Sequence, residues 1–135
     1  MKIFIGGSKE IGALPYRMKK ILYSIVKQSH EILIGDCYGT DLAVQQYLNK
    51  LKYRNVTVYT ACKKARNNIG NWKEISVRTD KRGFEAHRQK DSLMAEECDF
   101  SIMLWNGKSK GTYANIRELE DKGKKVILII CFPRN

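Results

Sequence analysis

The sequence predicts an α/β fold: a Rossmann-like domain with three α/β/α layers around a mainly parallel, five-stranded sheet. Two observations predict this class. Short β-branched runs alternate with segments of helical spacing along most of the chain. The 135 residues, 43% of them hydrophobic and only two of them proline, are enough for one ordinary core and unlike a disordered chain. We therefore expect residues 1–135 to form a single domain.

Five short, mostly apolar runs have the composition of strands that are buried on both faces of a sheet. They are Lys2–Ile5, Glu31–Ile34, Asn55–Thr60, Phe100–Leu104 and Lys125–Ile130. A chain that starts in the middle of a sheet and reverses direction once gives the strand order 3-2-1-4-5. In such sheets ligands bind beyond the carboxyl ends of the strands, at the switch point between the first and fourth strands.

Four intervening segments have apolar residues at helical spacing. They are Leu14–Gln28, Thr40–Leu51, Phe84–Glu97 and Thr112–Lys122. The first places Leu14, Met18, Ile21, Leu22 and Ile25 on one face, with Lys and Arg residues opposite. Right-handed crossovers place such helices on both faces of the sheet. Residues 61–83 have no clear period, and connections of this length are commonly functional loops.

The chain is strongly basic, with 25 Lys and Arg residues against 14 Asp and Glu residues and a formal net charge of +11. Residues 61–90 hold nine of the basic residues and three acidic ones, and so carry more than half of the excess. A basic surface of this kind attracts nucleotides, nucleic acid or other phosphates. The alternative interpretation is a solvated surface that keeps the protein soluble.

Three glycine-bearing loops follow three of the predicted strands, and all three lie at the carboxyl edge of the sheet. They are Gly6-Gly7-Ser8, the segment from Gly35 to Asp41, and the segment from Trp105 to Thr112. Glycines let backbone N–H groups approach an anion, and a helix N-terminus adds free donors and a positive dipole end. Lys108 and Lys110 add charge there, and Trp105 offers a ring for stacking. The three loops together predict a phosphate-binding crevice.

Other sequence features exclude several classes of protein. The cysteines form no C-x-x-C pair and there are two histidines, so we expect no metal site, and no cofactor is implied. The loop around Ser109 lacks the Walker A spacing, and both histidines precede this serine, unlike the hydrolase order. The apolar N-terminal stretch is too short for a signal peptide, and no run approaches the ~20 residues that cross a bilayer. We expect a cytoplasmic protein without a membrane partner.

Four segments together resemble the SLOG superfamily of Rossmann-like nucleotide-binding domains. They read GGS, GDCYGTD, RNNIGNW and KDSLMAEECDFSIMLWNGKSKGTYANI, the last running from Lys90 to Ile116. The resemblance covers nearly the whole chain and is nearest to small bacterial and phage members of uncharacterised function. Wider relatives include the LOG-type phosphoribohydrolases, which cleave a base from a nucleoside monophosphate, and DNA-processing protein A.

The resemblance implies a pocket for a nucleotide or a nucleotide-derived ligand. The phosphate would lie against the turn from Ser109 to Thr112, and the ribose or base near Asp36 or Asp41. The lining that the resemblance implies is Gly6, Gly7, Ser8, Gly35, Asp36, Gly39, Asp41, Asp91, Gly107, Ser109, Gly111 and Thr112. To these the residues themselves add Trp105 and Lys108, and two side chains of the middle loop.

Those two side chains are Arg66 and Trp72. If residues 66–72 fold over the crevice, Arg66 would hold a phosphate with two hydrogen bonds and Trp72 would stack on a base. This loop, together with the helix that follows it, is expected to overhang the crevice. The alternative is a surface loop that Trp72 anchors to the core.

The sequence departs from the LOG-type pattern at a position that matters for catalysis. Asn115 stands where those enzymes carry the glutamate that assists departure of the base, and Asn cannot act as a general base. Asn106 likewise replaces the aspartate of the usual W-D-G. A substitute carboxylate would be Asp36, Asp41 or Asp91, although aspartates at these places also cap turns and helices.

Three hypotheses of function follow. The first is a protein that senses or sequesters a nucleotide or nucleotide-derived molecule. The second is an enzyme, an N-glycosidase or phosphoribohydrolase that acts on nucleoside monophosphates with one of the three aspartates. The third is a nucleic-acid-binding module that uses the basic segment 61–90. A homo-oligomer is a further expectation, because members of the resembled family often assemble and a neighbouring subunit can complete a small pocket.

Overall fold

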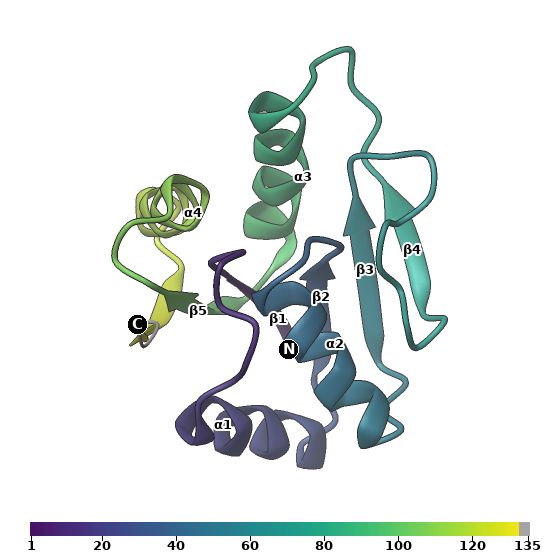
Figure 1. Cartoon of the computed structure of the whole chain (residues 1–135), viewed down its shortest axis with the longest axis vertical. Helices are drawn as coiled ribbons and strands as arrows, with labels where there is room; N and C mark the ends of the chain where they lie inside the picture. Colours follow the sequence, from purple (N-terminus) through teal and green to yellow (C-terminus); the bar gives the residue numbers. More distant parts are fainter. Residues whose placement is uncertain (133–135) are drawn as a thin grey trace.

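The computed structural model describes residues 1–132 as ten elements in an α/β order (Figure 1). In chain order these are β1 (Lys2–Gly7), α1 (Tyr16–Lys27), β2 (Glu31–Gly35), α2 (Thr40–Lys50), β3 (Val56–Thr60), β4 (Lys73–Ser76), α3 (Phe84–Glu97), β5 (Phe100–Trp105), α4 (Lys110–Asp121) and β6 (Lys125–Ile130). All strand pairs are parallel, in the order β4-β3-β2-β1-β5-β6. The predicted Rossmann-like class and the relative order of the five predicted strands are confirmed.

The sheet has six strands rather than five, because the predicted long connection contains β4. This strand pairs with β3, from Thr57 opposite Lys73 to Thr60 opposite Ser76. It lies at the edge of the sheet, and three of its four residues are exposed. A solvated edge strand needs no apolar run, so the pattern that identified the other strands is missing here.

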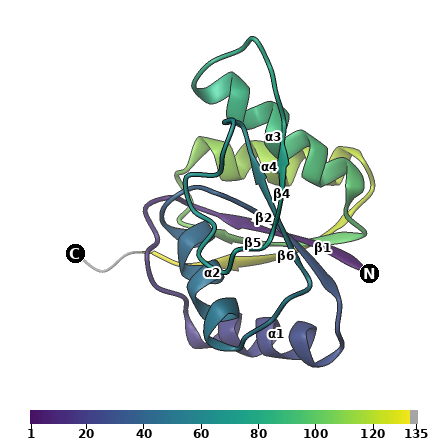
Figure 2. The ribbon, with the colours of Figure 1, turned by 90° about the vertical axis from the view of Figure 1, so that its right-hand side faces the viewer.

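Helices α1 and α2 cover one face of the sheet and α3 and α4 the other, which gives the three layers seen edge-on in Figure 2. Alternate strand residues supply the two cores. Ile5, Ile34 and Ile102 face the side of α1 and α2, whereas Phe4 and Met103 face the side of α3 and α4. Within residues 1–132, no helix is both long enough and apolar enough to cross a bilayer.

The carboxyl ends of β1, β2 and β5 are tied together by hydrogen bonds. The Ser8 N–H donates to the Leu104 carbonyl at 2.9 Å, and the Thr40 hydroxyl donates to the Ser8 carbonyl at 2.8 Å. Gly39 makes this possible, because its φ of +75° favours glycine and a Cβ there would overlap the Lys9 backbone. The fold thus brings the first two glycine loops against the end of β5.

Candidate functional site

A cavity of about 590 Å³ opens at the carboxyl edge of the sheet, between the loops after β1, β2 and β5 and the helices α3 and α4. Nine of the residues predicted to bind a ligand line it. They are Gly6, Gly7, Gly35, Asp41, Asp91, Lys108, Ser109, Gly111 and Thr112. The remaining walls are mainly basic or apolar and come from Phe4, Lys9, Glu10, Cys37, Phe84, His87, Arg88, Lys90, Met94, Asn106 and Lys110.

One end of the cavity is formed by the start of α4 and is rich in donors and positive charge. The Asn106 carboxamide oxygen accepts the N–H groups of Lys108 and Ser109, at 2.9 and 2.8 Å, which fixes the turn before the helix. Ser109 is the N-cap and accepts the Thr112 N–H at 3.4 Å. The N–H groups of Lys110 and Gly111 find no acceptor among residues 1–132, as first-turn donors commonly do not. An anion at this end would meet free donors and a positive dipole end.

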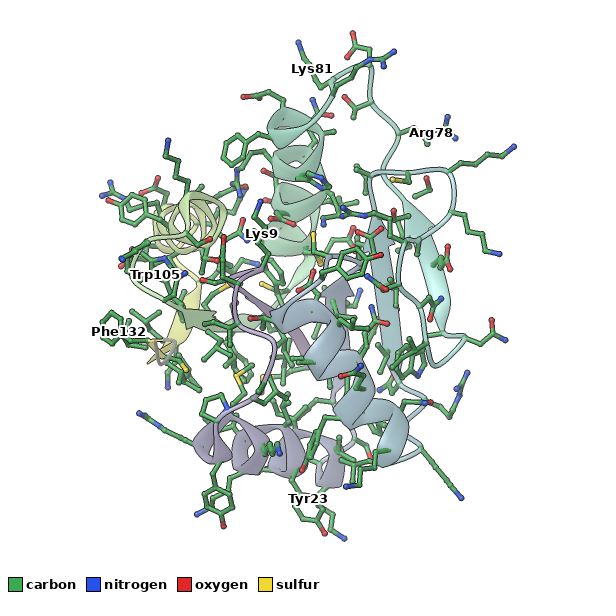
Figure 3. The ribbon with its side chains drawn as sticks, viewed as in Figure 1. Lys9, Tyr23, Arg78, Lys81, Trp105 and Phe132 are labelled. Carbon is green, nitrogen blue, oxygen red and sulfur yellow. The ribbon has the colours of Figure 1, made fainter. Side chains whose placement is uncertain are left out.

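Three exposed lysines line the cavity. Lys108 and Lys110 are exposed at its rim, and Lys9 comes from the loop after β1. In Figure 3 Lys9 lies at the base of α3, whereas Trp105 lies on the other side of α4. The exposed lysines of the cavity therefore come from two segments that are far apart in the sequence.

The floor of the cavity contains a lysine that is almost wholly out of water. Lys90 is 1% exposed, and its Nζ lies 3.6 Å from Oδ1 of Asp36, 3.6 Å from Oδ1 of Asp91 and 3.6 Å from Sγ of Cys37. Burial by itself would lower the pKa of Lys90, but the surrounding Asp91, Cys37 and Asp41 side chains raise it above its ordinary value. Lys90 is thus a fixed positive charge beneath the floor.

Two of the three candidate catalytic aspartates reach the cavity. Burial, with smaller contributions from the charges of Asp91 and Asp36, raises the pKa of Asp41 to about 7, against the opposing effect of Lys90 and of the Cys37 N–H. Asp41 packs on Gly35 so closely that a Cβ there would lie 2.5 Å from its Oδ2. Asp41 is therefore a wall residue that changes charge near neutral pH.

Asp91 is held in the opposite wall by a polar network behind it. Asn115 donates to Oδ2 of Asp91 at 3.0 Å, and Nη1 of Arg88 lies 3.8 Å from the same oxygen. Asn115 also accepts from Arg88, which in turn pairs with Glu118 at 2.6 Å. Asn115 itself does not line the cavity. The carboxylate that faces the cavity on this side is that of Asp91.

The prediction that Asp36 contacts a ligand or acts as a catalyst is corrected by its surroundings. Its side chain is fully buried and accepts from Nη2 of Arg66 at 2.9 Å, from the Thr60 hydroxyl at 2.7 Å and from the Arg66 N–H at 3.0 Å. Burial would raise the pKa of Asp36, but these hydrogen bonds hold it well below its usual range. The Asp36 carboxylate fastens the end of β2 to the middle loop.

The expected overhang of residues 66–72 is also corrected. Arg66 is engaged by Asp36, and Trp72 is buried in the core on the α1 and α2 side, where its Nε1 donates to the Tyr53 carbonyl at 2.8 Å. The loop packs on the end of β2 and on α2, where Gln45 binds the Asn67 carbonyl at 3.0 Å. Trp72 is therefore an anchor, and neither side chain lines the cavity.

Four other predicted contacts shape the loops without lining the cavity. The buried Ser8 hydroxyl accepts the Asn106 N–H at 3.1 Å, and Gly39 provides the turn already described. Trp105 donates from Nε1 to the Ser109 carbonyl at 3.0 Å, with its ring centroid 5.8 Å from that of Tyr113. Gly107 faces Phe132. These four residues stabilise the loops whose other residues line the cavity.

Besides Asp91, which the sequence already suggested, the wall from α3 contains residues that sequence reasoning did not identify. His87, Lys90, Asp91 and Met94 follow the spacing i, i+3, i+4, i+7, so they share one face of the helix. Burial, together with Lys90 and Arg66, lowers the pKa of His87, so this side chain is a neutral wall group at physiological pH. The signal was present as a polar stripe at helical spacing on a helix with little apolar character. Among residues 1–132, no group of three or more His, Cys, Asp or Glu side chains is arranged to hold a metal ion.

The fold and the cavity together define a Rossmann-like α/β domain with a glycine-lined site at its carboxyl edge. No family model matches the sequence, and no curated protein matches it. A solved structure of DNA processing protein A from Helicobacter pylori, a protein described by its single-stranded DNA binding mode, has a similar fold with a TM-score of 0.74. The two sequences are 16% identical, and the match covers 100% of this chain and 66% of that one. This chain thus spans slightly less than two thirds of that protein, and the likeness establishes the fold.

Proposed function

We propose that this domain binds a nucleotide or a nucleotide-derived molecule in the cavity, with its phosphate against the start of α4. The observation that carries the proposal is that the two kinds of polar group lie in different parts of one cavity. Free N–H groups and lysines lie at one end, and the carboxyl groups of Asp41 and Asp91 lie in its other walls. The volume of about 590 Å³ is within the range of roughly 300–1,000 Å³ typical of small-molecule sites.

The walls suggest how such a ligand would lie. Carboxyl groups accept hydrogen bonds from sugar hydroxyls, which suits Asp41 and Asp91 to the ribose. Phe84, half exposed at the start of α3, and His87 one turn later offer planar groups for the base. In this orientation the phosphate of a mononucleotide would meet the start of α4, the ribose would meet the two carboxyl groups, and the base would meet the planar side chains.

The test compares nucleoside monophosphates with the corresponding nucleosides by thermal shift and calorimetry. At a nucleotide concentration about 100 times Kd, linkage predicts about 2.7 kcal/mol of stabilisation, a shift on the order of 10 °C. The paired variant Lys108→Glu with Lys110→Glu should lose this shift. Lys63→Glu with Lys64→Glu changes the net charge equally but lies outside the cavity, and should keep it. Absence of a shift with every nucleotide and dinucleotide tried would remove the proposal.

Hydrolysis is the second candidate, favoured by one observation. Asp41 has a pKa of about 7 and lines the same space as Asp91, so the walls hold a carboxyl group suited to donate a proton and a second carboxyl group in the same cavity. Chromatographic detection of free base from nucleoside monophosphates tests it. Asp41→Asn and Asp91→Asn should each abolish release even at nucleotide concentrations that saturate the variant, because Asn lacks the acidic group but keeps an oxygen that can accept a hydrogen bond from the ribose. If wild-type protein releases no base, the domain is a binding protein.

A nucleic-acid partner is the third candidate, favoured by the likeness to a protein that binds single-stranded DNA. Lys63, Lys64, Arg78, Lys81 and Arg82 of the basic segment are exposed, and Figure 3 has Arg78 and Lys81 pointing away from the body of the molecule. Retention of the protein on single-stranded DNA should fall steeply as salt rises. The predicted homo-oligomer stays a prediction.

A further inference from the structure

Helix α1 carries an aromatic and basic surface that the cavity does not use. Its inner residues Met18, Leu22 and Ile25 are buried against the sheet, whereas Tyr16 is 76% exposed and Tyr23 is 47% exposed. The helix also contains four Lys or Arg residues and no acidic residue. It lies on the opposite face of the sheet from α3 and α4, and Tyr23 points away from the molecule there (Figures 1 and 3).

The tyrosines border a groove between α1 and α2. The groove is lined by Tyr16, Lys19, Lys20, Tyr23 and, from α2, Tyr47, and has a volume of about 410 Å³. The Tyr47 hydroxyl donates to the Lys19 carbonyl at 3.3 Å and so joins the two helices. Three tyrosines and two lysines thus line one shallow, open surface.

Each of the two exposed tyrosines of α1 has a lysine over its ring. Nζ of Lys20 lies 5.7 Å from the ring centroid of Tyr16, and Nζ of Lys27 lies 5.6 Å from that of Tyr23. The two tyrosines are seven residues apart, about 10.5 Å along the helix axis. The same aromatic and cationic pair therefore repeats after two turns on one side of α1.

We propose that this tyrosine–lysine groove binds single-stranded nucleic acid, with bases stacked on Tyr16 and Tyr23 and phosphates beside the lysines. Proteins that bind single strands combine a basic groove with aromatic rings that accept any base. A duplex offers no free base faces to such rings. A membrane-surface helix would expose aliphatic side chains, but those of α1 are occupied by the core.

This surface is separate from the cavity, and it gives the nucleic-acid candidate a contact site outside the basic segment 61–90. The first experiment measures the affinity of labelled oligothymidine by fluorescence anisotropy. We expect Tyr16→Ala with Tyr23→Ala to weaken binding at least about tenfold. Tyr113→Ala is the matched control, because Tyr113 is 48% exposed but lies on α4, and it should bind like wild type. Replacing Lys20 and Lys27 by Gln should reduce the salt slope by about 1.4.

The second experiment maps the contact by ultraviolet crosslinking of a bromodeoxyuridine strand, followed by mass spectrometry. Crosslinks in the peptide that contains Tyr16 and Tyr23 are expected. Crosslinks confined to residues 61–90, or equal affinity in the double tyrosine variant, would overturn the α1 surface but leave the nucleic-acid candidate. Equal affinity for duplex DNA, or binding only to anionic lipid vesicles, would also overturn it. If the protein binds no single strand even at low salt, both the α1 surface and the nucleic-acid candidate are overturned. Nucleotide binding in the cavity is measured separately and is not affected by that outcome.

Discussion

The ammonium group of Lys90 lies 3.6 Å from the Asp91 carboxylate, beneath the floor of the cavity and almost completely shielded from water. Asp36 lies at the same distance on another side of the ammonium group, and burial alone would favour a neutral lysine. The charge persists because acidic neighbours surround it. The positive charge of Lys90 and the negative charges around it therefore stabilise one another beneath the cavity. Removing any one of these charges should destabilise the others.

Replacing Lys90 by Met should destabilise the protein strongly. The substitution keeps most of the side-chain volume but removes the buried cation, so that Asp36 keeps Arg66 and Asp91 keeps Arg88 as charged partners. We therefore expect a loss near the lower end of the roughly 3–5 kcal/mol in the free energy of unfolding that breaking a buried ion pair costs. Urea denaturation measures the change. Lys122→Met is the control, because Lys122 pairs with Glu96 at the surface and should change stability by less than about 1 kcal/mol. Equal losses in the two variants would contradict the buried network.

Asp41 should make stability fall as the pH rises toward neutrality. Its pKa is about 7 in the folded state against 3.8 ordinarily, so between these values the native state holds a proton that the unfolded state releases. The stabilising contribution is complete below about pH 4 and is lost as the pH rises through 7. Asp41→Asn stays neutral, so its melting temperature should depend less on pH over this range. Identical pH profiles for wild type and Asp41→Asn would refute the shifted pKa.

Gly35→Ala should disturb the site more than most alanine substitutions of glycine. The new Cβ would lie 2.5 Å from Oδ2 of Asp41 and 3.1 Å from Nζ of Lys90, so Asp41 would have to move and give up the hydrogen bond that it accepts from the Cys37 N–H. We expect a loss of about 1–3 kcal/mol, as for overpacked cores. Gly111→Ala meets no atom within 4 Å and should leave the melting temperature nearly unchanged. Comparable melting temperatures for the two variants would argue against the tight packing.

The central strands were predictable, because parallel strands buried on both faces have continuous apolar sequences. The three glycine loops were predictable as one site, because the carboxyl ends of parallel strands lie at the same edge of the sheet. The edge strand β4 was not, since only Ile75 among its residues is even partly buried. Its position follows from pairing with β3, a contact that local pattern does not encode.

The side chains of the site were harder to assign than its backbone. Arg66 and Asp36 are thirty residues apart, and each looked free to bind a ligand until the fold paired them. Trp72 was a choice between stacking on a ligand and anchoring the loop, and its burial favours the anchor. Lys90 was hidden among the charges of α3, because a sequence does not reveal which polar face of a weakly amphipathic helix turns inward.

Ligand binding in the cavity should protect one cysteine and not another. Cys37 lines the cavity and Cys62 is exposed outside it. Burial, together with the charge of Asp41, raises the pKa of the Cys37 thiol, so little of it is thiolate at neutral pH and its alkylation should be slow. Iodoacetamide labelling followed by mass spectrometry should therefore modify Cys62 first. An excess of AMP should slow labelling of Cys37 severalfold further while Cys62 keeps its rate, whereas parallel protection of both, or of neither, would count against the cavity as the nucleotide site.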